Sequence, residues 1–114
     1  MATTTLKRLG GPVAIVTTDG EKVLYTCPSA TVAIVKTVRF VLPSTGTAQT
    51  VSWGILPNGQ TAGTGARWVL QDMDLGPADP VTDQFAHILG AGDKIIALVS
   101  GTGATVTVSG AEVV

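Results

Sequence analysis

Residues 31–42 constrain the fold of this chain more than any other segment, because apolar and polar side chains alternate there over the length of a strand. The even positions from Val32 to Leu42 are apolar with the single exception of Lys36, and the odd positions are mixed. A period of two with many β-branched residues is typical of a strand with one buried face. The segment therefore predicts a scaffold strand whose even positions form the buried face.

Similar short apolar segments recur along the chain, separated by turns that contain Gly or Pro. The dipeptide Asp19-Gly20 predicts a hairpin between the first two strands, and Asn58-Gly59 supplies a second turn, which joins residues 50–56 to 67–70. Residues 93–100 are apolar on both faces, which indicates a central or interface strand. Strands are expected at residues 13–18, 22–26, 31–42, 50–56, 67–70, 84–89, 93–100 and 104–109.

Two segments between these strands are harder to assign. Residues 71–83 carry four aspartates and two prolines and are expected to be irregular. Residues 80–89 also fit a short helix with Asp79 as its N-cap and Pro80 in its first turn, although a strand at 84–89 is favoured. The whole pattern predicts an all-β fold, an antiparallel β-sandwich or jelly roll of roughly seven or eight short strands. In this prediction residues 1–11 form an extended N-terminal arm and residues 12–114 form one domain.

The sparse charge of the chain argues against several classes of partner. Seven basic and eight acidic residues give a net charge of −1, without the basic excess that nucleic-acid binding requires. No apolar run approaches the roughly 18 residues of a membrane span, and the N-terminus lacks the apolar stretch of a signal peptide. We therefore expect no nucleic-acid or membrane partner and synthesis in a cytoplasm. Weak self-repulsion and a core poor in aromatic residues favour association with other subunits.

The residue types needed for catalysis or metal binding are scattered. His87 is the sole histidine. It would serve a metal site only if it met Asp72, Asp74 or Asp83 in space, and a small hydrolase only if it lined a pocket. Cys27 has no partner for a disulfide and is expected to be a small buried residue. Asp72-x-Asp74 begins like a calcium loop but continues with Leu-Gly-Pro, so that motif fails, although an irregular calcium site stays open. No catalytic, cofactor-binding or metal-binding residue is predicted, and the chain is not expected to be an enzyme.

Both tryptophans lie on the predicted hairpin of residues 50–70. One reading places one of them in the core and the other at a rim. The alternative is that one anchors an interface, where tryptophan is enriched. Together with two leucines of the N-terminal arm, they give the predicted interface residues Leu6, Leu9, Trp53 and Trp68.

Three segments, in order, carry a resemblance to a known family. They are Leu24-Tyr25-Thr26-Cys27-Pro28 with the strand that follows, Leu89-Gly90-Ala91-Gly92-Asp93-Lys94-Ile95, and Ala104-Thr105-Val106-Thr107-Val108-Ser109-Gly110. In these segments the chain resembles small β-sandwich virion proteins of tailed bacteriophages, from which it departs by Cys27 in place of valine and by a longer insert at residues 57–88.

The resemblance implies a structural role on the exterior of a phage particle. Head decoration is the favoured reading, a minor tail or tail-fibre-base protein is the alternative, and a carbohydrate-binding module that exposes Trp53 or Trp68 is a third. The implied partners are further copies of the chain in a homotrimer and the major capsid protein or the tail proteins of the same virion. The residues of the N-terminal arm are the candidate docking element.

Overall fold

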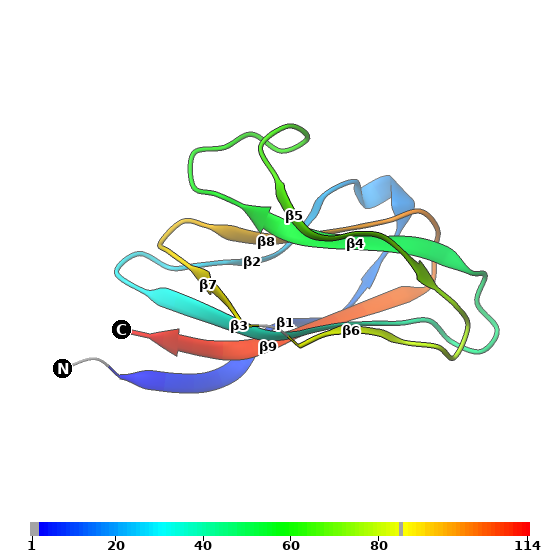
Figure 1. Ribbon diagram of the computed structural model, residues 1–114, viewed down its shortest axis with the longest axis horizontal. Helices are drawn as coiled ribbons and strands as arrows, with labels where there is room; N and C mark the ends of the chain where they lie inside the picture. Colours follow the sequence, from blue (N-terminus) through cyan, green and yellow to red (C-terminus); the bar gives the residue numbers. More distant parts are fainter. Residues whose placement is uncertain (1–2, 85) are drawn as a thin grey trace.

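The computed structural model describes residues 3–84 and 86–114, which form two antiparallel sheets packed face to face (Figure 1). The described part of the chain contains no helix long and apolar enough to cross a membrane. The strands confirm the predicted all-β sandwich. They are β1 (Thr4–Ile15), β2 (Lys22–Thr26), β3 (Val32–Val41), β4 (Gln49–Leu56), β5 (Arg67–Leu75), β6 (Val81–Asp83), β7 (His87–Leu89), β8 (Lys94–Val99) and β9 (Ala104–Val113), with one 3-10 turn, η1 (Thr17–Asp19).

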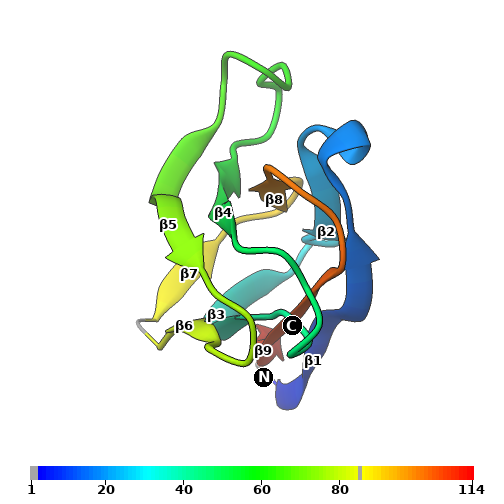
Figure 2. The ribbon, with the colours of Figure 1, turned by 90° about the vertical axis from the view of Figure 1, so that its right-hand side faces the viewer.

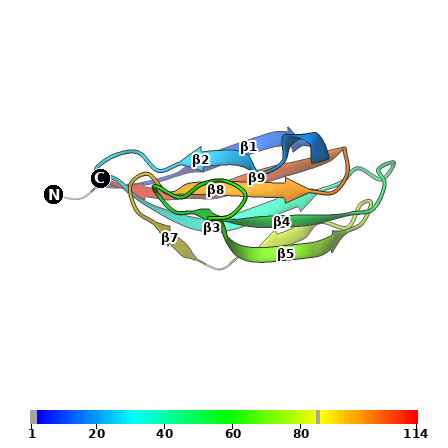
Figure 3. The same cartoon turned by 90° about the horizontal axis from the view of Figure 1, so that it is seen from above.

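The strand order is that of a jelly roll. One sheet has the order β1-β9-β3-β6, with β7 also paired to β3, and the other has the order β2-β8-β4-β5 (Figure 3). Strands β6 and β7 occupy the same edge of β3, so they act as one interrupted strand. Apart from β4 and β5, which pair with each other in one sheet, successive strands then alternate between the two sheets, as in the jelly rolls of viral capsid and lectin domains.

The two sheets enclose one core of mostly aliphatic side chains, which also contains Phe40 and Trp53. Val51 and Trp53 on β4 are completely buried and Ile55 packs against the same core, so these alternate residues of β4 face inward. Strand β8 lies between β2 and β4, which confirms the prediction of a central strand from its two apolar faces.

Strand β3 buries different residues from those that its sequence pattern predicts. In its first half the odd positions Ala33 and Val35 are buried, whereas in its second half the even positions Val38 and Phe40 are buried. The pairing with β9 shifts between Val35 and Thr37, so one extra residue is inserted there. Such a bulge moves all later side chains to the opposite face, which explains why the even-numbered face is wrong for the first half.

The N-terminal residues form a strand of the sandwich and not a separate arm. Strand β1 pairs with β9 from Thr4 to Ile15 and so runs across the expected boundary at residue 11. Gly10 and Gly11 lie at two register shifts within the strand, where a sequence reading places the end of an arm. A Cβ atom on Gly11 would lie 2.2 Å from the carbonyl oxygen of Val106, so this glycine permits a close approach to β9. The first and last strands are neighbours, and both termini lie at the same end of the molecule (Figure 1).

The Asp19-Gly20 turn does not close a hairpin. Strand β1 belongs to one sheet and β2 to the other, so η1 and Gly20 carry the chain over the rim of the sandwich. The Asp19 carboxylate accepts a hydrogen bond from the Val16 amide at 2.9 Å and stabilises this corner. The turn signal is present, but it marks a change of sheet.

The segment of residues 71–89 is more regular than its composition suggests. Strand β5 continues to Leu75, beyond the predicted end at residue 70, and the backbone of Asp72 has a φ of 54° at an irregular point within it. The predicted strand at 84–89 is observed only as β7, and residue 85 lies outside the described residues. The helical alternative for 80–89 is wrong for the described positions, since β6 and β7 are strands paired to β3.

Candidate functional site

The four predicted interface residues lie in different environments. Trp53 is 0% exposed and Leu9 is 8% exposed, and both belong to the core. As interface residues they are therefore wrong, because neither presents its side chain to a partner. Leu6 is 74% exposed and Trp68 is half-buried, so an interface role for these two stays a prediction.

Trp68 lies on the outer face of the four-stranded sheet. Cross-strand pairing puts Trp68 opposite Gly54, Gly54 opposite Ile96, and Ile96 opposite Val23, so the four form one row. A Cβ atom on Gly54 would lie 2.5 Å from the carbonyl oxygen of Arg67, which shows how closely β5 approaches β4 here. The loop between β4 and β5 rises above this same face (Figures 1 and 2). The structure thus assigns the tryptophans one to the core and one to the surface, as the first of the two readings predicts.

The only histidine does meet an aspartate, in a cluster with the core tryptophan. The Trp53 indole Nε1 donates a hydrogen bond of 2.9 Å to the Asp83 carboxylate. His87 Nε2 lies 3.9 Å from the same carboxylate, and its ring stands edge-on to that of Trp53 at 5.1 Å. A buried carboxylate that accepts from an indole fixes the position of β6 against β4. Because the cluster joins side chains of β4, β6 and β7, we assign it to stability.

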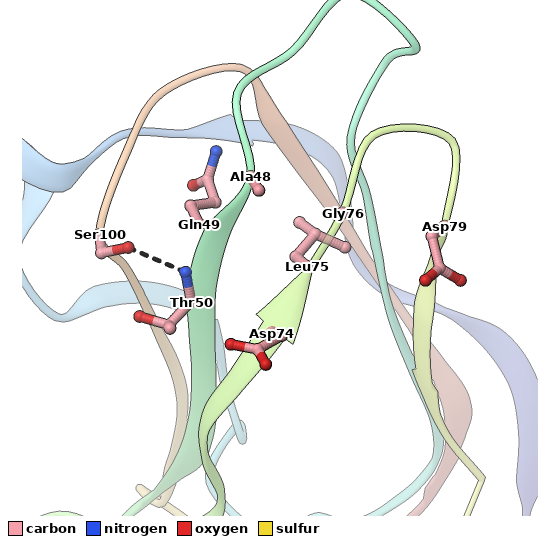
Figure 4. Close-up of a pocket in the computed structure, with 8 residues that line it drawn as sticks. All are labelled: Ala48, Gln49, Thr50, Asp74, Leu75, Gly76, Asp79 and Ser100. Atoms are coloured by element: carbon pink, nitrogen blue, oxygen red, sulfur yellow. Dashed lines mark hydrogen bonds between the residues drawn. The ribbon is translucent and has the colours of Figure 1, made fainter.

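No metal site emerges from the acidic residues. Within residues 3–84 and 86–114, no group of three or more His, Cys, Asp or Glu side chains could hold a metal ion. An open pocket of about 580 Å³ lies at one end of the sandwich, where β5 ends, and Asp74 and Asp79 line it (Figure 4). Gln49, Thr50 and Ser100 complete its polar wall, and Ser100 Oγ accepts a hydrogen bond from the Thr50 amide at 2.9 Å. Ala48 and Leu75 also line the pocket, so it is a depression of mixed polar and apolar character with two carboxylates.

The Leu-Gly-Ala-Gly-Asp-Lys-Ile segment serves a structural purpose in this chain. The Asp93 carboxylate accepts hydrogen bonds from the Gly90 amide at 2.9 Å and from the Asn58 amide at 2.8 Å. The backbone of Asp93 also accepts a hydrogen bond from the Cys27 amide at 2.8 Å. One aspartate therefore ties together three loops at one end of the sandwich.

Cys27 is buried, as expected of a small residue before a turn. It is 1% exposed, and its thiol lies 3.3 Å from the carbonyl oxygen of Thr31. Burial raises the pKa of the Cys27 thiol above its ordinary value. The burial hides the sulfur from reagents, and the raised pKa lowers the fraction of the thiolate form that reacts with electrophiles.

We therefore expect the native chain to react with a thiol reagent at least ~100-fold more slowly than the urea-unfolded chain. The matched control is a chain with Cys27→Val and Ser29→Cys, which moves the single thiol to an exposed position in the same turn. This control should react rapidly when folded. Equal rates for the two folded chains would contradict the buried placement of Cys27.

A polar contact between Tyr25 and Glu112 joins the two sheets. The Tyr25 hydroxyl on β2 donates to the Glu112 carboxylate on β9 at 2.5 Å, and Lys7 Nζ on β1 lies 2.9 Å from its other oxygen. The hydrogen bond from Tyr25, followed by the interaction with Lys7, lowers the pKa of Glu112. Burial, followed by the contact with Glu112, raises the pKa of Tyr25.

These shifts predict a loss of stability at both ends of the pH range. The ionised Glu112 stabilises the fold above its ordinary pKa of 4.5, and this contribution is lost as the pH falls through the lowered pKa. The neutral Tyr25 stabilises the fold below its ordinary pKa of 10.0, and this contribution is lost as the pH rises through the raised pKa. Urea unfolding at a series of pH values gives the free energy of unfolding as a function of pH. This free energy should fall less steeply toward acid pH in Glu112→Gln than in the wild type, and less steeply toward alkaline pH in Tyr25→Phe. If both variants had the same pH dependence of the free energy of unfolding as the wild type, the contact between Tyr25 and Glu112 would not stabilise the fold.

The outer face of the five-stranded sheet is divided into an apolar and a basic part. Leu6, Ala111, Ile34 and Ile88 pair in sequence across the strands and form one apolar row, which the outward-facing Val32 extends. Leu6 and Ile88, at the two ends of this row, are 74% and 71% exposed. Beyond the row, the exposed residues on this face or at its bulge include Arg8, Lys36 and Arg39. Of this surface, only Leu6 was predicted from the sequence, because only the strand pairing shows that the other residues are its neighbours.

Comparison with known proteins identifies the fold but no family. No protein-family model matches the chain, and no characterised protein matches it in sequence. The structure is similar to a chain in the structure of infectious bursal disease virus, Gx strain, with a TM-score of 0.62 and 12% sequence identity. The match covers 100% of this chain and 33% of the viral chain, so this chain spans about a third of the length of that neighbour. At this identity the likeness concerns the fold alone.

Proposed function

We propose that the chain is a non-enzymatic structural protein of a virus particle. The observation that carries the proposal is the jelly-roll strand order over the whole described chain, an architecture that recurs in viral capsid domains and is similar to part of a viral chain. A mechanical role is supported by the polar side-chain contacts inside the fold, because these contacts link strands to one another and so stiffen the sandwich. The contacts of Asp83 with Trp53 and of Glu112 with Tyr25 are of this kind.

More specifically, we propose that it is a decoration protein on the exterior of a tailed-phage head. The three sequence segments that resemble phage β-sandwich proteins support this placement. Many weak contacts at symmetry-related positions would sum to a large stabilisation of the particle. The implied partners are the major capsid protein and other copies of the chain, and the homotrimer stays a prediction from the resemblance.

Quantitative mass spectrometry of purified particles tests this proposal through the copy number of the chain relative to the major capsid protein. A near-stoichiometric copy number is expected for a decoration protein. A handful of copies per particle would reject the head placement in favour of a minor tail or tail-fibre-base protein. Complete absence from particles would overturn the virion role and favour a carbohydrate-binding module, which would rely on Trp68 because Trp53 is buried.

A further inference from the structure

Within the described residues, three of the five Lys and Arg side chains that form no ion pair lie on the outer face of the five-stranded sheet, and the other two are Arg67 and Lys94. Arg8, Lys36 and Arg39 are exposed there, and none of the acidic side chains of the sheet shares this face, since Glu112 and Asp83 pair with inward positions. Within residues 3–84 and 86–114, the ion pairs involve Lys7, Lys22 and His87 and none of these three. We call this surface, together with Leu6, Ile34 and Ile88 of the apolar row, the basic face.

The complementary charge lies on the other sheet. Asp72 and Asp74 of β5 and Asp79 of the turn after it are exposed, and they take part in none of the ion pairs of the described residues. Two exposed apolar residues of β5, Val69 and Met73, lie beside them. We call these five residues the acidic margin. It follows the outer edge of the four-stranded sheet, where β5 has no neighbouring strand on one side (Figure 3).

The sheet edges themselves are poorly suited to pairing with another chain. Strand β1 contains two register shifts, β2 contains one, and β5 contains two, one of them at the positive φ of Asp72. The edge beside β3 is interrupted between β6 and β7. Bulges, breaks and charges of this kind oppose the addition of a further strand. A contact with another molecule is therefore expected to use side chains on a face or margin.

We propose that the acidic margin of one copy of the chain docks on the basic face of the next copy. Three unneutralised carboxylates would then meet three unneutralised basic groups, and Val69 and Met73 would cover part of the apolar row. Complementary charge of this kind selects the partner and fixes the orientation. Because two different surfaces meet, the contact is heterologous and generates a closed ring or an open chain of copies. The inference goes beyond the proposed function, since it holds whether or not the chain belongs to a particle.

Sedimentation velocity of the purified full chain over a range of concentrations tests this contact. The wild type should associate reversibly, and more weakly at high salt. Reversal of the basic face by Lys36→Glu with Arg39→Glu should raise the dissociation constant at least ~10-fold, as should reversal of the acidic margin by Asp74→Lys with Asp79→Lys. A variant with Gln60→Glu and Thr64→Glu, two exposed positions of the loop between β4 and β5, is the matched control and should associate like the wild type.

An equimolar mixture of the two charge-reversed variants is the most decisive sample in this experiment. Each variant alone carries two surfaces of like charge, but in the mixture an acidic surface of one always meets a basic surface of the other. Association should return in the mixture, with both variants in the same species. The proposal is overturned if the wild type remains monomeric at its highest soluble concentration, if the reversed variants associate as tightly as the wild type, or if mixing restores nothing. None of these outcomes bears on the copy number in particles, so the two proposals fail separately.

Discussion

Replacing Trp53 with alanine is expected to lower the free energy of unfolding by about 3–5 kcal/mol, the range for deletion of a large buried aromatic side chain. Trp53 is completely buried between the sheets, and its indole donates to Asp83. The substitution therefore leaves a cavity in the core and removes a buried hydrogen bond between β4 and β6. Urea unfolding followed by circular dichroism measures the effect.

Trp68→Ala is the control, because it deletes the same side chain from the surface of the same hairpin. Trp68 is half-buried, so we expect a cost below about 2 kcal/mol. Trp53→Phe separates the two causes, since it keeps much of the buried ring and loses the indole donor. Equal costs for Trp53→Ala and Trp68→Ala would show that the assignment of one tryptophan to the core is wrong.

The second large effect is expected at Gly110 in β9, where alanine should destabilise the fold by more than about 3 kcal/mol. A Cβ atom at this position would lie 1.9 Å from the carbonyl oxygen of Ile34 and 3.0 Å from its carbonyl carbon. The obstacle is backbone, which cannot rotate away as a side chain can. Strand β9 would have to separate from β3 at the centre of the five-stranded sheet.

Gly90→Ala provides the comparison for this glycine. The nearest atom to its added Cβ would be a side-chain oxygen of Asp93 at 3.7 Å, an ordinary contact, and its φ is not positive. We expect a change within about 0.5 kcal/mol. If chemical denaturation gave the two alanine variants the same stability, the close approach of β9 to β3 would be disproved.

Much of the fold could be predicted from local patterns. The alternation along residues 50–56 places Val51, Trp53 and Ile55 on one face of a strand, and these residues do share the core-facing side of β4. The two apolar faces of 93–100 identified the central strand β8. These predictions succeeded because each depends on side chains within one strand. Cys27 was equally accessible to such reasoning, since a lone small residue before a turn is normally buried.

The failures arise where the pairing of distant segments decides the structure. The bulge after Val35 exchanges the buried face of β3, and nothing in the alternation of that strand marks it. The N-terminal residues read as an arm because their partner, β9, lies at the other end of the sequence. Strand β5 continues through Asp72 and Asp74, whose charge suggests a loop, because its outer side is exposed.

The apolar row of the five-stranded sheet could not be predicted from the sequence, for the same reason. Ile34 and Ile88 are far apart in the chain and become neighbours of Leu6 only through β9 and β3. Leu9, although close to Leu6, points to the opposite side of β1 and is buried. Without the register of β1, the sequence does not show which of the two leucines is exposed and which is buried.

The most direct test of a structural role in a virus particle is electron cryomicroscopy of particles produced with and without this chain. If the chain is a structural protein of the head, the difference map should contain the two-sheet sandwich at repeated positions on the exterior of the head. Adding the purified chain to the deficient particles should restore this density. Identical maps with and without the chain would show that the chain is not a structural part of the particle.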